Sequence, residues 1–566
     1  MKKTKILIPV IAVIVVLGAI FAAIWVKKYK PTSRMADLDA YFGNEKGEIT
    51  LVMGDTICEQ KGLYQDGHVY VDADTVNTYL NKRFYWDSYE NMMLYTTSKS
   101  VYTLEPDSLE YKENNSKGTL DYVALTMKDV TPYLALDYVA QYTALDYKVY
   151  EKPDRAVITY RFGEDEDYIK AAKDTEIRNG AGIKHPILAK VKKSDKLRFL
   201  EKGKGEKPFD KVMTESGIVG YIDREKIGSR FREAQTTEFR EETYTHITSD
   251  KKINLVWHQV TSSYANEGLL NLLNATKGVN VVVPTWFRVS RNKGEITSLA
   301  SDSYVERAHG LGVQVWGLCD DFGSDSKIAV VLSRTSSRRK LAKNLVAEAI
   351  RYELDGINID FEYVKSEGGK DFIQFIRELG IMCRNNGIVL AVDNYPPASY
   401  NNYYDREEQA KVADYVIVMA YDEYFAGSET AGPVSSLTYV QDGVDNTIAQ
   451  GVPAGQLIVG LPFYSRLWKE TKNKSGEIKV SSEAYGMNRA KSILTEEEAR
   501  VNWDDLTGMN YGEFKSGSAT YKMWLENDKS LTEKIRYATG KDVAGLAFWK
   551  LGLEDSAIWD TIIKYN

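Results

Sequence analysis

Eight short apolar runs, separated by stretches with helical periodicity, occupy the second half of the chain. Stretches such as residues 369–387 place Phe372 and Ile376 on one helical face. Apolar strands that alternate with helices are typical of a parallel sheet covered by helices, and eight such pairs predict a (β/α)8 TIM barrel over residues 250–566. The long interval after the seventh run predicts a small insertion. The runs lie at 253–260, 279–287, 313–319, 356–362, 388–395, 415–422, 457–464 and 545–552.

Two other patterns precede this predicted barrel. Residues 173–230 contain short apolar runs split by "NG", "GKG" and "SG", which predicts a small all-β barrel of five to six strands. Residues 31–170 contain a repeat with a constant offset of 63, which aligns Tyr70 with Tyr133. A strand, a short helix and a strand in each copy predict two small α+β units packed together.

The amino-terminal segment at residues 6–26 is apolar, carries no charge and is flanked by lysines. It is long enough to span a bilayer and longer than the apolar core of a typical signal peptide. We expect an uncleaved signal-anchor, with residues 1–5 as a cytoplasmic tail and residues 31–566 outside the cytoplasm, facing the cell wall. A cleaved signal peptide is the alternative, but no clear small-x-small site precedes Lys27.

Composition narrows the classes of partner. The chain of 566 residues has a formal net charge of −7 with well-mixed signs, which argues against nucleic acid as the main partner and leaves a neutral or cationic polymer. Its three cysteines and five histidines are scattered without redox or metal-ligand spacing. The spacing therefore predicts no disulfide framework and no metal site, and no organic cofactor is expected, because the chemistry considered below needs none.

The stretch "LDGINIDFEYV", residues 354–364, places carboxylates at the end of the predicted fourth barrel strand. Buried carboxylates are costly unless they are paired or have chemistry to perform. Active sites of such barrels lie at the carboxyl ends of the strands. The period of two puts Asn358, Asp360 and Glu362 on one face, and a bulge at Gly356 would bring Asp355 inward as well. The sequence therefore predicts an acidic catalytic column inside the barrel.

The motif "DGINIDFE" resembles the signature D-G-x-D-x-D-x-E of glycoside hydrolase family 18. The resemblance extends over residues 250–566 through "MAYDEYFAGSETAGPVSSL", "GLPFYSRLW", "WLENDKSLTEKI" and "GLAFWKLGLED". It is most specific to bacterial members that cut peptidoglycan, including the spore-cortex N-acetylglucosaminidases. Asn358 stands where most of the family has a second Asp, and its amide can donate the hydrogen bond that a protonated Asp would donate.

The amino-terminal regions resemble two other domain families. Residues 31–170 resemble the stalk-like amino-terminal domain of copper amine oxidases, for which we expect a spacer role without copper chemistry. Residues 173–230, with "IRNGAG" and "KLRFL", resemble a bacterial SH3-type domain. Such domains accompany cell-wall enzymes, so wall binding and a passive linker are both open for this region.

The family 18 resemblance implies roles for individual residues. Glu362 would be the general acid, Asp360 would orient the substrate's 2-acetamido group, and Tyr421 would donate a hydrogen bond to the acetamido oxygen. That oxygen would itself attack the anomeric carbon, so configuration is retained. His258, Trp286, Trp316 and Asp393 also lie near strand ends and are candidates for the groove lining, with packing or a rim position preferred over catalysis for each. The expected substrate-binding residues are Asp422, Met419, Trp549, Tyr464, Trp286 and Trp316.

These features together predict a membrane-anchored, extracytoplasmic hydrolase of β-1,4-linked N-acetylglucosamine polymers, with peptidoglycan as the expected substrate. The alternatives are a chitinase or endo-N-acetylglucosaminidase that acts on other glycans, and a non-catalytic, chitinase-like glycan-binding protein. The presence of both Glu362 and Asp360 favours the enzyme over the binding protein.

Overall fold

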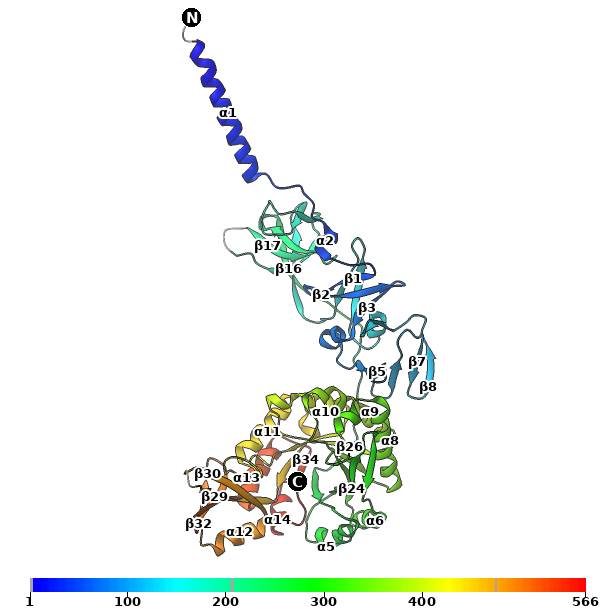
Figure 1. The fold of residues 1–566 in the computed structure, drawn as a ribbon, viewed down its shortest axis with the longest axis vertical. Helices are drawn as coiled ribbons and strands as arrows, with labels where there is room; N and C mark the ends of the chain where they lie inside the picture. The colour runs from blue at the N-terminus through cyan, green and yellow to red at the C-terminus, as the bar shows by residue number, and fades with distance from the viewer. Residues whose placement is uncertain (1–3, 205–207, 474–475, 566) are drawn as a thin grey trace. The chain divides into compact units, whose positions relative to one another are not determined.

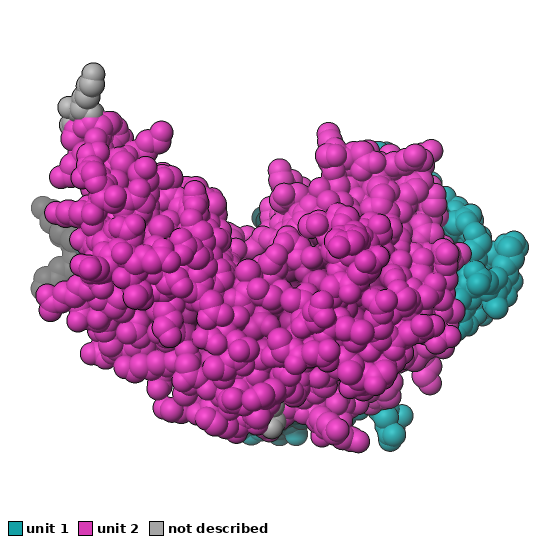
Figure 2. Space-filling view, turned by 90° about the horizontal axis from the view of Figure 1, so that it is seen from below, with its two compact units in different colours: residues 1–86, 103–242 teal, residues 87–102, 243–566 magenta. Residues whose placement is uncertain are grey.

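A computed structural model describes residues 4–204, 208–473 and 476–565 of the chain. The chain divides into two compact units, coloured teal and magenta in Figure 2. Unit 1 comprises Met1–Trp86 and Thr103–Glu242, and unit 2 comprises Asp87–Tyr102 and Thr243–Asn566. Each unit is described by itself below.

Unit 2 contains the predicted (β/α)8 barrel (Figure 1). All eight strands pair in parallel with their neighbours, and the ring closes because β21 pairs with β24 and β34 pairs with both β20 and β28. A hairpin of β22 (Phe287–Ser290) and β23 (Glu295–Ser298) extends the sheet beside β24. The barrel strands are β20 (Ile253–His258), β21 (Val281–Pro284), β24 (Gln314–Asp320), β25 (Gly356–Asp360), β26 (Val389–Asn394), β27 (Tyr415–Met419), β28 (Leu457–Pro462) and β34 (Gly545–Trp549).

Side chains alternate between two apolar layers of this barrel. On β25, Ile357 and Ile359 belong to the layer that packs against the helices, so Asn358 and Asp360 face the barrel interior. Packing of this outer layer accounts for the amphipathic pattern of the surrounding helices. These are α5 (Leu269–Leu273), α6 (Asp302–Gly310), α7 (Ile328–Leu332), α8 (Thr335–Arg351), α9 (Gly369–Asn385), α10 (Arg406–Val412), α11 (Leu437–Ala449), α13 (Asp528–Gly540) and α14 (Ile558–Ile562).

The expected insertion lies between β28 and β34. Five strands form an antiparallel sheet in the order β30-β29-β33-β32-β31, and α12 (Met487–Glu496) packs against it. In the view of Figure 2 the surface of unit 2 is hollowed by a broad notch between two raised parts. The strands are β29 (Tyr464–Lys472), β30 (Ile478–Gly486), β31 (Arg500–Asp504), β32 (Met509–Ser516) and β33 (Ala519–Leu525).

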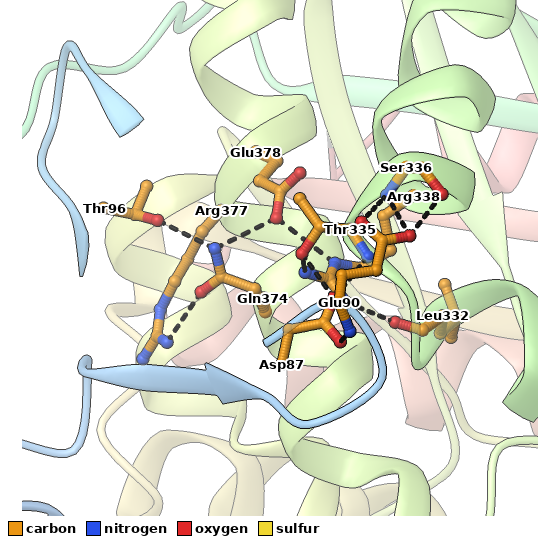
Figure 3. Close-up of polar contacts among 10 residues, drawn as sticks. All are labelled: Asp87, Glu90, Thr96, Leu332, Thr335, Ser336, Arg338, Gln374, Arg377 and Glu378. Carbon is orange, nitrogen blue, oxygen red and sulfur yellow. Dashed lines mark hydrogen bonds and ion pairs between the residues drawn. The ribbon is translucent and has the colours of Figure 1, made fainter. Parts of the chain in front are cut away.

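Unit 2 also includes residues 87–102, which we call the docked segment and which contain β5 (Met92–Thr96) (Figure 3). Asp87 is fully buried, and its Oδ2 accepts hydrogen bonds from the backbone N–H and the hydroxyl of Thr335, both at 2.6 Å. The carboxylate of Glu90 accepts a hydrogen bond from the N–H of Ser336, and Thr96 accepts one from Gln374 on α9 at 2.9 Å.

The start of α8 explains why these carboxylates matter. Its N-cap residue, Arg334, makes no side-chain cap hydrogen bond, and its first turn contains no acidic residue. Exposed N–H groups at a helix start need acceptors, and the helix dipole favours negative charge there. Asp87 and Glu90, which lie about 250 residues earlier in the chain, supply both the acceptors and the negative charge at the start of α8.

Unit 1 begins with the apolar helix α1 (Thr4–Tyr29) and continues with a seven-stranded sheet in the order β11-β12-β1-β2-β3-β10-β9. The 63-residue repeat is visible in its elements: β3 and α3 (Ala73–Thr75) match β10 and α4 (Leu136–Val139), and β3 pairs with β10. The strands are β1 (Glu48–Met53), β2 (Thr56–Gln65), β3 (His68–Asp72), β9 (Leu125–Lys128), β10 (Thr131–Ala135), β11 (Asp146–Tyr150) and β12 (Arg155–Thr159). Unit 1 also contains α2 (Leu38–Phe42) and a hairpin of β7 (Glu110–Glu113) and β8 (Ser116–Thr119).

The second sheet of unit 1 covers the all-β region expected at residues 173–230. Six of its strands begin within residues 173–230, in agreement with the five to six expected there, and the seventh, β13, lies before residue 173 and pairs with the long strand β19. The sheet order is β15-β14-β18-β17-β16-β13-β19. The strands are β13 (Asp165–Ala171), β14 (Thr175–Arg178), β15 (Ile187–Val191), β16 (Lys196–Glu201), β17 (Phe209–Met213), β18 (Val219–Asp223) and β19 (Ile227–Ala234).

The apolar part of α1 meets the length and composition needed to cross a membrane. Its residues Val10–Tyr29 have a mean hydropathy of 2.6. A signal sequence near the amino terminus would have the same properties, so the helix is consistent with either an anchor or a signal peptide.

Candidate active site

A cavity of about 380 Å³ opens at the carboxyl ends of the barrel strands. Most residues predicted for the site line it together. They are Asp360, Glu362, Met419, Tyr421, Asp422, Trp549 and Trp286. The other lining residues, which were not predicted as site residues, include Trp257, Asp320, Asp393 and Tyr395.

Glu362 lies just beyond the carboxyl end of β25, where Asp321 and Tyr395 hold it in place. Asp321 accepts hydrogen bonds from the backbone N–H groups of Glu362 and Tyr363 at 3.0 and 2.9 Å, which fixes the turn of the chain after the strand. The hydroxyl of Tyr395 donates to Glu362 Oε2. Burial raises the pKa of Glu362, and the Tyr395 hydrogen bond opposes that rise. Glu362 therefore keeps its proton to a higher pH than an ordinary glutamate, as a general acid requires.

Asp360 lies deeper in the cavity and is 7% exposed. Among the described residues its Oδ1 has no hydrogen-bond partner. Burial, together with the carboxyls of Asp393 and Glu362, raises its pKa well above the ordinary range. A buried polar atom without a partner is expected to bind a ligand group, so Asp360 Oδ1 is available to accept a hydrogen bond from a substrate N–H.

Asn358 is fully buried beneath this cluster and connects three strands. Its Oδ1 accepts a hydrogen bond from Trp257 Nε1 at 3.1 Å, and its Nδ2 donates to Asp393 Oδ1 at 2.9 Å. Asp393 is 3% exposed and lines the cavity, as a candidate for the groove lining would. The signal was present in the sequence: Asp393 and Tyr395 share the inward-facing parity of Val389 and Ala391.

Aromatic side chains form one wall of the cavity. The ring centroids of Trp257 lie 6.3 Å from Tyr421 and 6.1 Å from Trp549. Burial raises the pKa of Tyr421 well above 10, so its hydroxyl is a hydrogen-bond donor at neutral pH. Such a wall can hold the apolar face of a sugar ring while Tyr421 supplies a polar contact.

Two acidic groups that line the cavity are fixed by partners. Tyr464 does not line the cavity, but its hydroxyl donates to Asp422 Oδ1 at 2.6 Å and so orients a residue that does. Arg288 binds Asp320 through two hydrogen bonds, at 2.7 and 2.9 Å, in a bidentate pair. These contacts hold both carboxylates in place before any ligand arrives.

The structure does not bring Asp355 or Trp316 into the site. Asp355 precedes β25, where its carboxylate bonds His309 Nε2 and the N–H of Val315, both at 2.8 Å. The expected bulge at Gly356 is absent because Gly356 pairs regularly in the sheet, and the lack of a side chain makes room for Trp316. Trp316 is itself buried in the barrel core, stacked on Tyr415.

Two other expectations concern histidine and metal. His258 is buried and hydrogen-bonded to Tyr304 at 2.9 Å, which agrees with a packing role. Within the described part of the chain, no cluster of three His, Cys, Asp or Glu side chains is arranged to hold a metal ion.

Comparisons with known proteins agree with this geometry. Residues 317–554 match the family model of glycosyl hydrolases family 18. The chain is 23% identical over 300 residues to the uncharacterized glycosylase YvbX of Bacillus subtilis. The aligned stretch covers 50% of this chain and 84% of that protein. It is 22% identical over 243 residues to the cortical fragment-lytic enzyme of Bacillus subtilis. This aligned stretch covers 42% of this chain and only 55% of the relative.

A chitinase from Chromobacterium violaceum shares the fold, with a TM-score of 0.50 and 21% identity, over 56% of this chain and 99% of that structure. The catalytic motif, the parallel barrel and the matched residues agree on one family. Residues 317–554 are therefore a glycoside hydrolase family 18 domain, similar to those of chitinases and cortex-lytic enzymes.

Proposed function

We propose that the chain is a membrane-anchored, extracytoplasmic enzyme that hydrolyses β-1,4 bonds of an N-acetylglucosamine-containing polymer, with peptidoglycan as its substrate. Glu362 is the general acid, and the substrate's own acetamido oxygen is the nucleophile. The observation that carries the proposal is that Glu362 and Asp360 line the same aromatic-walled cavity, where Asp360 Oδ1 is a buried acceptor without a partner among the described residues.

The reaction follows from the placement of these groups. Glu362 gives its proton to the glycosidic oxygen as the bond to the anomeric carbon breaks. The acetamido oxygen of the same sugar attacks that carbon, which forms a cyclic oxazolinium-like intermediate with positive charge. Asp360 accepts a hydrogen bond from the acetamido N–H and stabilises the charge, while Tyr421 donates to the acetamido oxygen. Water then opens the ring with Glu362 as base, and configuration is retained.

Three observations support the substrate and location. The relatives include a cortical fragment-lytic enzyme, the amino-terminal helix is long and apolar enough to cross a membrane, and residues 173–230 lie in an all-β region that resembles a bacterial SH3-type domain. An anchor of this kind and a wall-binding module would keep the barrel close to the cell wall, which supports peptidoglycan as the proposed substrate.

The test is a digest of purified peptidoglycan and of chitin oligosaccharides by the detergent-solubilised full chain, with Glu362→Gln as the matched control. We expect wall fragments with reducing N-acetylglucosamine ends in the mass spectrum, and at least 100-fold less product from the variant, a magnitude of about the size that loss of a general acid brings. Cleavage of chitin alone would replace the proposed substrate. Retained glycan binding without cleavage of either polymer would contradict the enzymatic function.

A further inference from the structure

A single cation lines the cavity, and the proposed mechanism does not use it. Arg288 on β22 is the one basic side chain among the described residues that line the cavity. We propose that Arg288 is a specificity-determining residue that binds the lactyl carboxylate of a muramic acid next to the reacting sugar. The inference rests on the proposed hydrolase function and deepens it, because muramic acid distinguishes peptidoglycan from chitin.

Strand pairing places Arg288 in one row with the catalytic carboxyls. In the parallel pairs of the sheet, Arg288 of β22 lies opposite Asp320 of β24, and Asp320 lies opposite Asp360 of β25. Neighbouring strands are about 4.8 Å apart, so the backbone at Arg288 lies about 10 Å from the backbone at Asp360. All three residues line the cavity. Arg288 is therefore close enough to contact a sugar beside the one that Asp360 holds.

The guanidinium of Arg288 is fixed by one carboxylate and retains donors for another. Its Nε and Nη2 donate to Asp320 at 2.7 and 2.9 Å, and Asp320 is itself only 3% exposed. A guanidinium has five N–H donors, so two remain on Nη1 and one on Nη2. These donors have no partner among the described residues, and the Arg288 side chain is 51% exposed. Nη1 and Nη2 thus form a free fork that can bind a carboxylate through two parallel hydrogen bonds.

The charges around the fork allow an anionic group to approach it. The hydrogen bond with Asp320 raises the pKa of Arg288, so the guanidinium stays charged at every pH at which the enzyme is assayed. Burial raises the pKa values of Asp360, Glu362 and Asp393. These three groups therefore carry less negative charge near neutral pH than three ordinary carboxyls would. Repulsion from the cavity is reduced, and the free fork of Arg288 supplies the attraction.

The chemistry of the proposed polymer supplies a group that fits the fork. Peptidoglycan alternates N-acetylglucosamine with N-acetylmuramic acid, which carries a lactyl ether on one of its hydroxyl oxygens. When an N-acetylglucosamine within a strand reacts, both of its neighbours are therefore muramic acids. Chitin offers an uncharged hydroxyl at the same position, which cannot engage both N–H groups of the fork as a carboxylate does. Binding of the lactyl carboxylate thus favours peptidoglycan over chitin at one catalytic centre.

The experiment compares the detergent-solubilised full chain with Arg288→Lys on two probes. The first probe is a tetrasaccharide of alternating N-acetylglucosamine and N-acetylmuramic acid with free lactyl carboxylates. The second is the same tetrasaccharide with these carboxyls reduced to alcohols. Lysine keeps a positive charge beside Asp320 but has no planar fork. The quantity measured is the ratio of kcat/KM for the two probes, so an effect of the substitution on catalysis itself cancels.

Lys340→Gln is the matched control. Lys340 on α8 binds Glu295 at 2.8 Å on β23, the other strand of the Arg288 hairpin, but it does not line the cavity. We expect the wild type and this control to prefer the acidic probe by about 10- to 100-fold, mainly through KM, and the preference to fall at least about tenfold in Arg288→Lys. An unchanged preference in Arg288→Lys, an equal fall in Lys340→Gln, or no preference in the wild type would overturn the proposal.

A binding measurement keeps the inference testable if the wild type cleaves neither probe nor peptidoglycan, a result that would refute the proposed function alone. Calorimetric titration of the Glu362→Gln protein with the two tetrasaccharides gives their Kd values without catalysis. The acidic probe should bind about 10- to 100-fold more tightly, and Arg288→Lys in this background should remove most of that difference. Equal Kd values for the two probes would overturn the proposal even in an active enzyme.

Discussion

At the scale of single residues, the main feature of the site is that its buried carboxyl groups differ in proton affinity. Glu362, Asp360 and Asp393 line one cavity but differ in their hydrogen-bond partners. Glu362 accepts from the Tyr395 hydroxyl and Asp393 accepts from the Asn358 amide, whereas Asp360 Oδ1 has no partner among the described residues. Different partners give like groups different proton affinities. This arrangement lets one carboxyl donate a proton while another carries charge.

The Tyr395 hydrogen bond gives the first prediction at this scale. The phenol donates to Glu362 and stabilises its ionised form, which lowers its pKa against the effect of burial. Tyr395→Phe removes this donor, so the pKa of Glu362 should rise and the alkaline limb of kcat/KM should move upward by roughly 0.5 to 1 pH unit. Activity is lost as pH rises through this pKa, because the acid must be protonated.

Tyr404→Phe is the matched control for that measurement. Tyr404 is a buried tyrosine whose hydroxyl donates to the backbone oxygen of Phe361 at 2.9 Å rather than to the acid. We expect this variant to change stability without moving the alkaline limb. A downward shift in Tyr395→Phe, or equal shifts in both variants, would show that Tyr395 does not tune Glu362.

Much of the site was predictable from the sequence because period-two alternation and the strand-end rule need only local information. Both rules correctly place Asp360 and Glu362 in the cavity. The same alternation applied to β26 would have found Asp393 and Tyr395, which show no recognisable motif of their own. Asp355 was misplaced because Gly356 accommodates Trp316 instead of forming a bulge, a packing fact that sequence spacing does not show.

At the scale of elements, the docked segment is the feature that no local pattern predicts. The eight barrel strands and the insertion follow from hydrophobic runs and their spacing, so they were predictable. The acceptors for the start of α8 lie about 250 residues upstream, however, and the helix sequence only reveals that it lacks a cap of its own. Residues 87–102 are thus a structural part of the catalytic unit.

Loss of the Asp87 carboxylate should therefore destabilise the barrel. Asp87→Ala leaves the N–H and hydroxyl of Thr335 without their buried acceptor, which should lower the free energy of unfolding by about 2 kcal/mol. Chemical denaturation followed by tryptophan fluorescence measures this change. Asp505→Ala, at an exposed aspartate in the turn between β31 and β32, is the control and should change it by less than about 0.5 kcal/mol. Equal stability of the two variants would contradict a capping role.

At the scale of the whole molecule, the two units combine different kinds of structure. Unit 1 offers an apolar helix and two antiparallel or mixed sheets, and unit 2 offers a barrel with a cavity at its strand ends. The fold class of each region was predictable from the change in hydrophobic pattern along the chain. The assignment of residues 87–102 to unit 2 was not, because it depends on contacts distant in sequence.

The central claim is that the substrate's acetamido group, held by Asp360, performs the nucleophilic step. The most direct measurement compares cleavage of chitin hexasaccharide with cleavage of its fully deacetylated counterpart by the full chain, with the anomeric configuration of early products read by proton NMR. We predict cleavage of the acetylated substrate alone, with β products. Comparable cleavage of the deacetylated substrate, or α products, would contradict the claim.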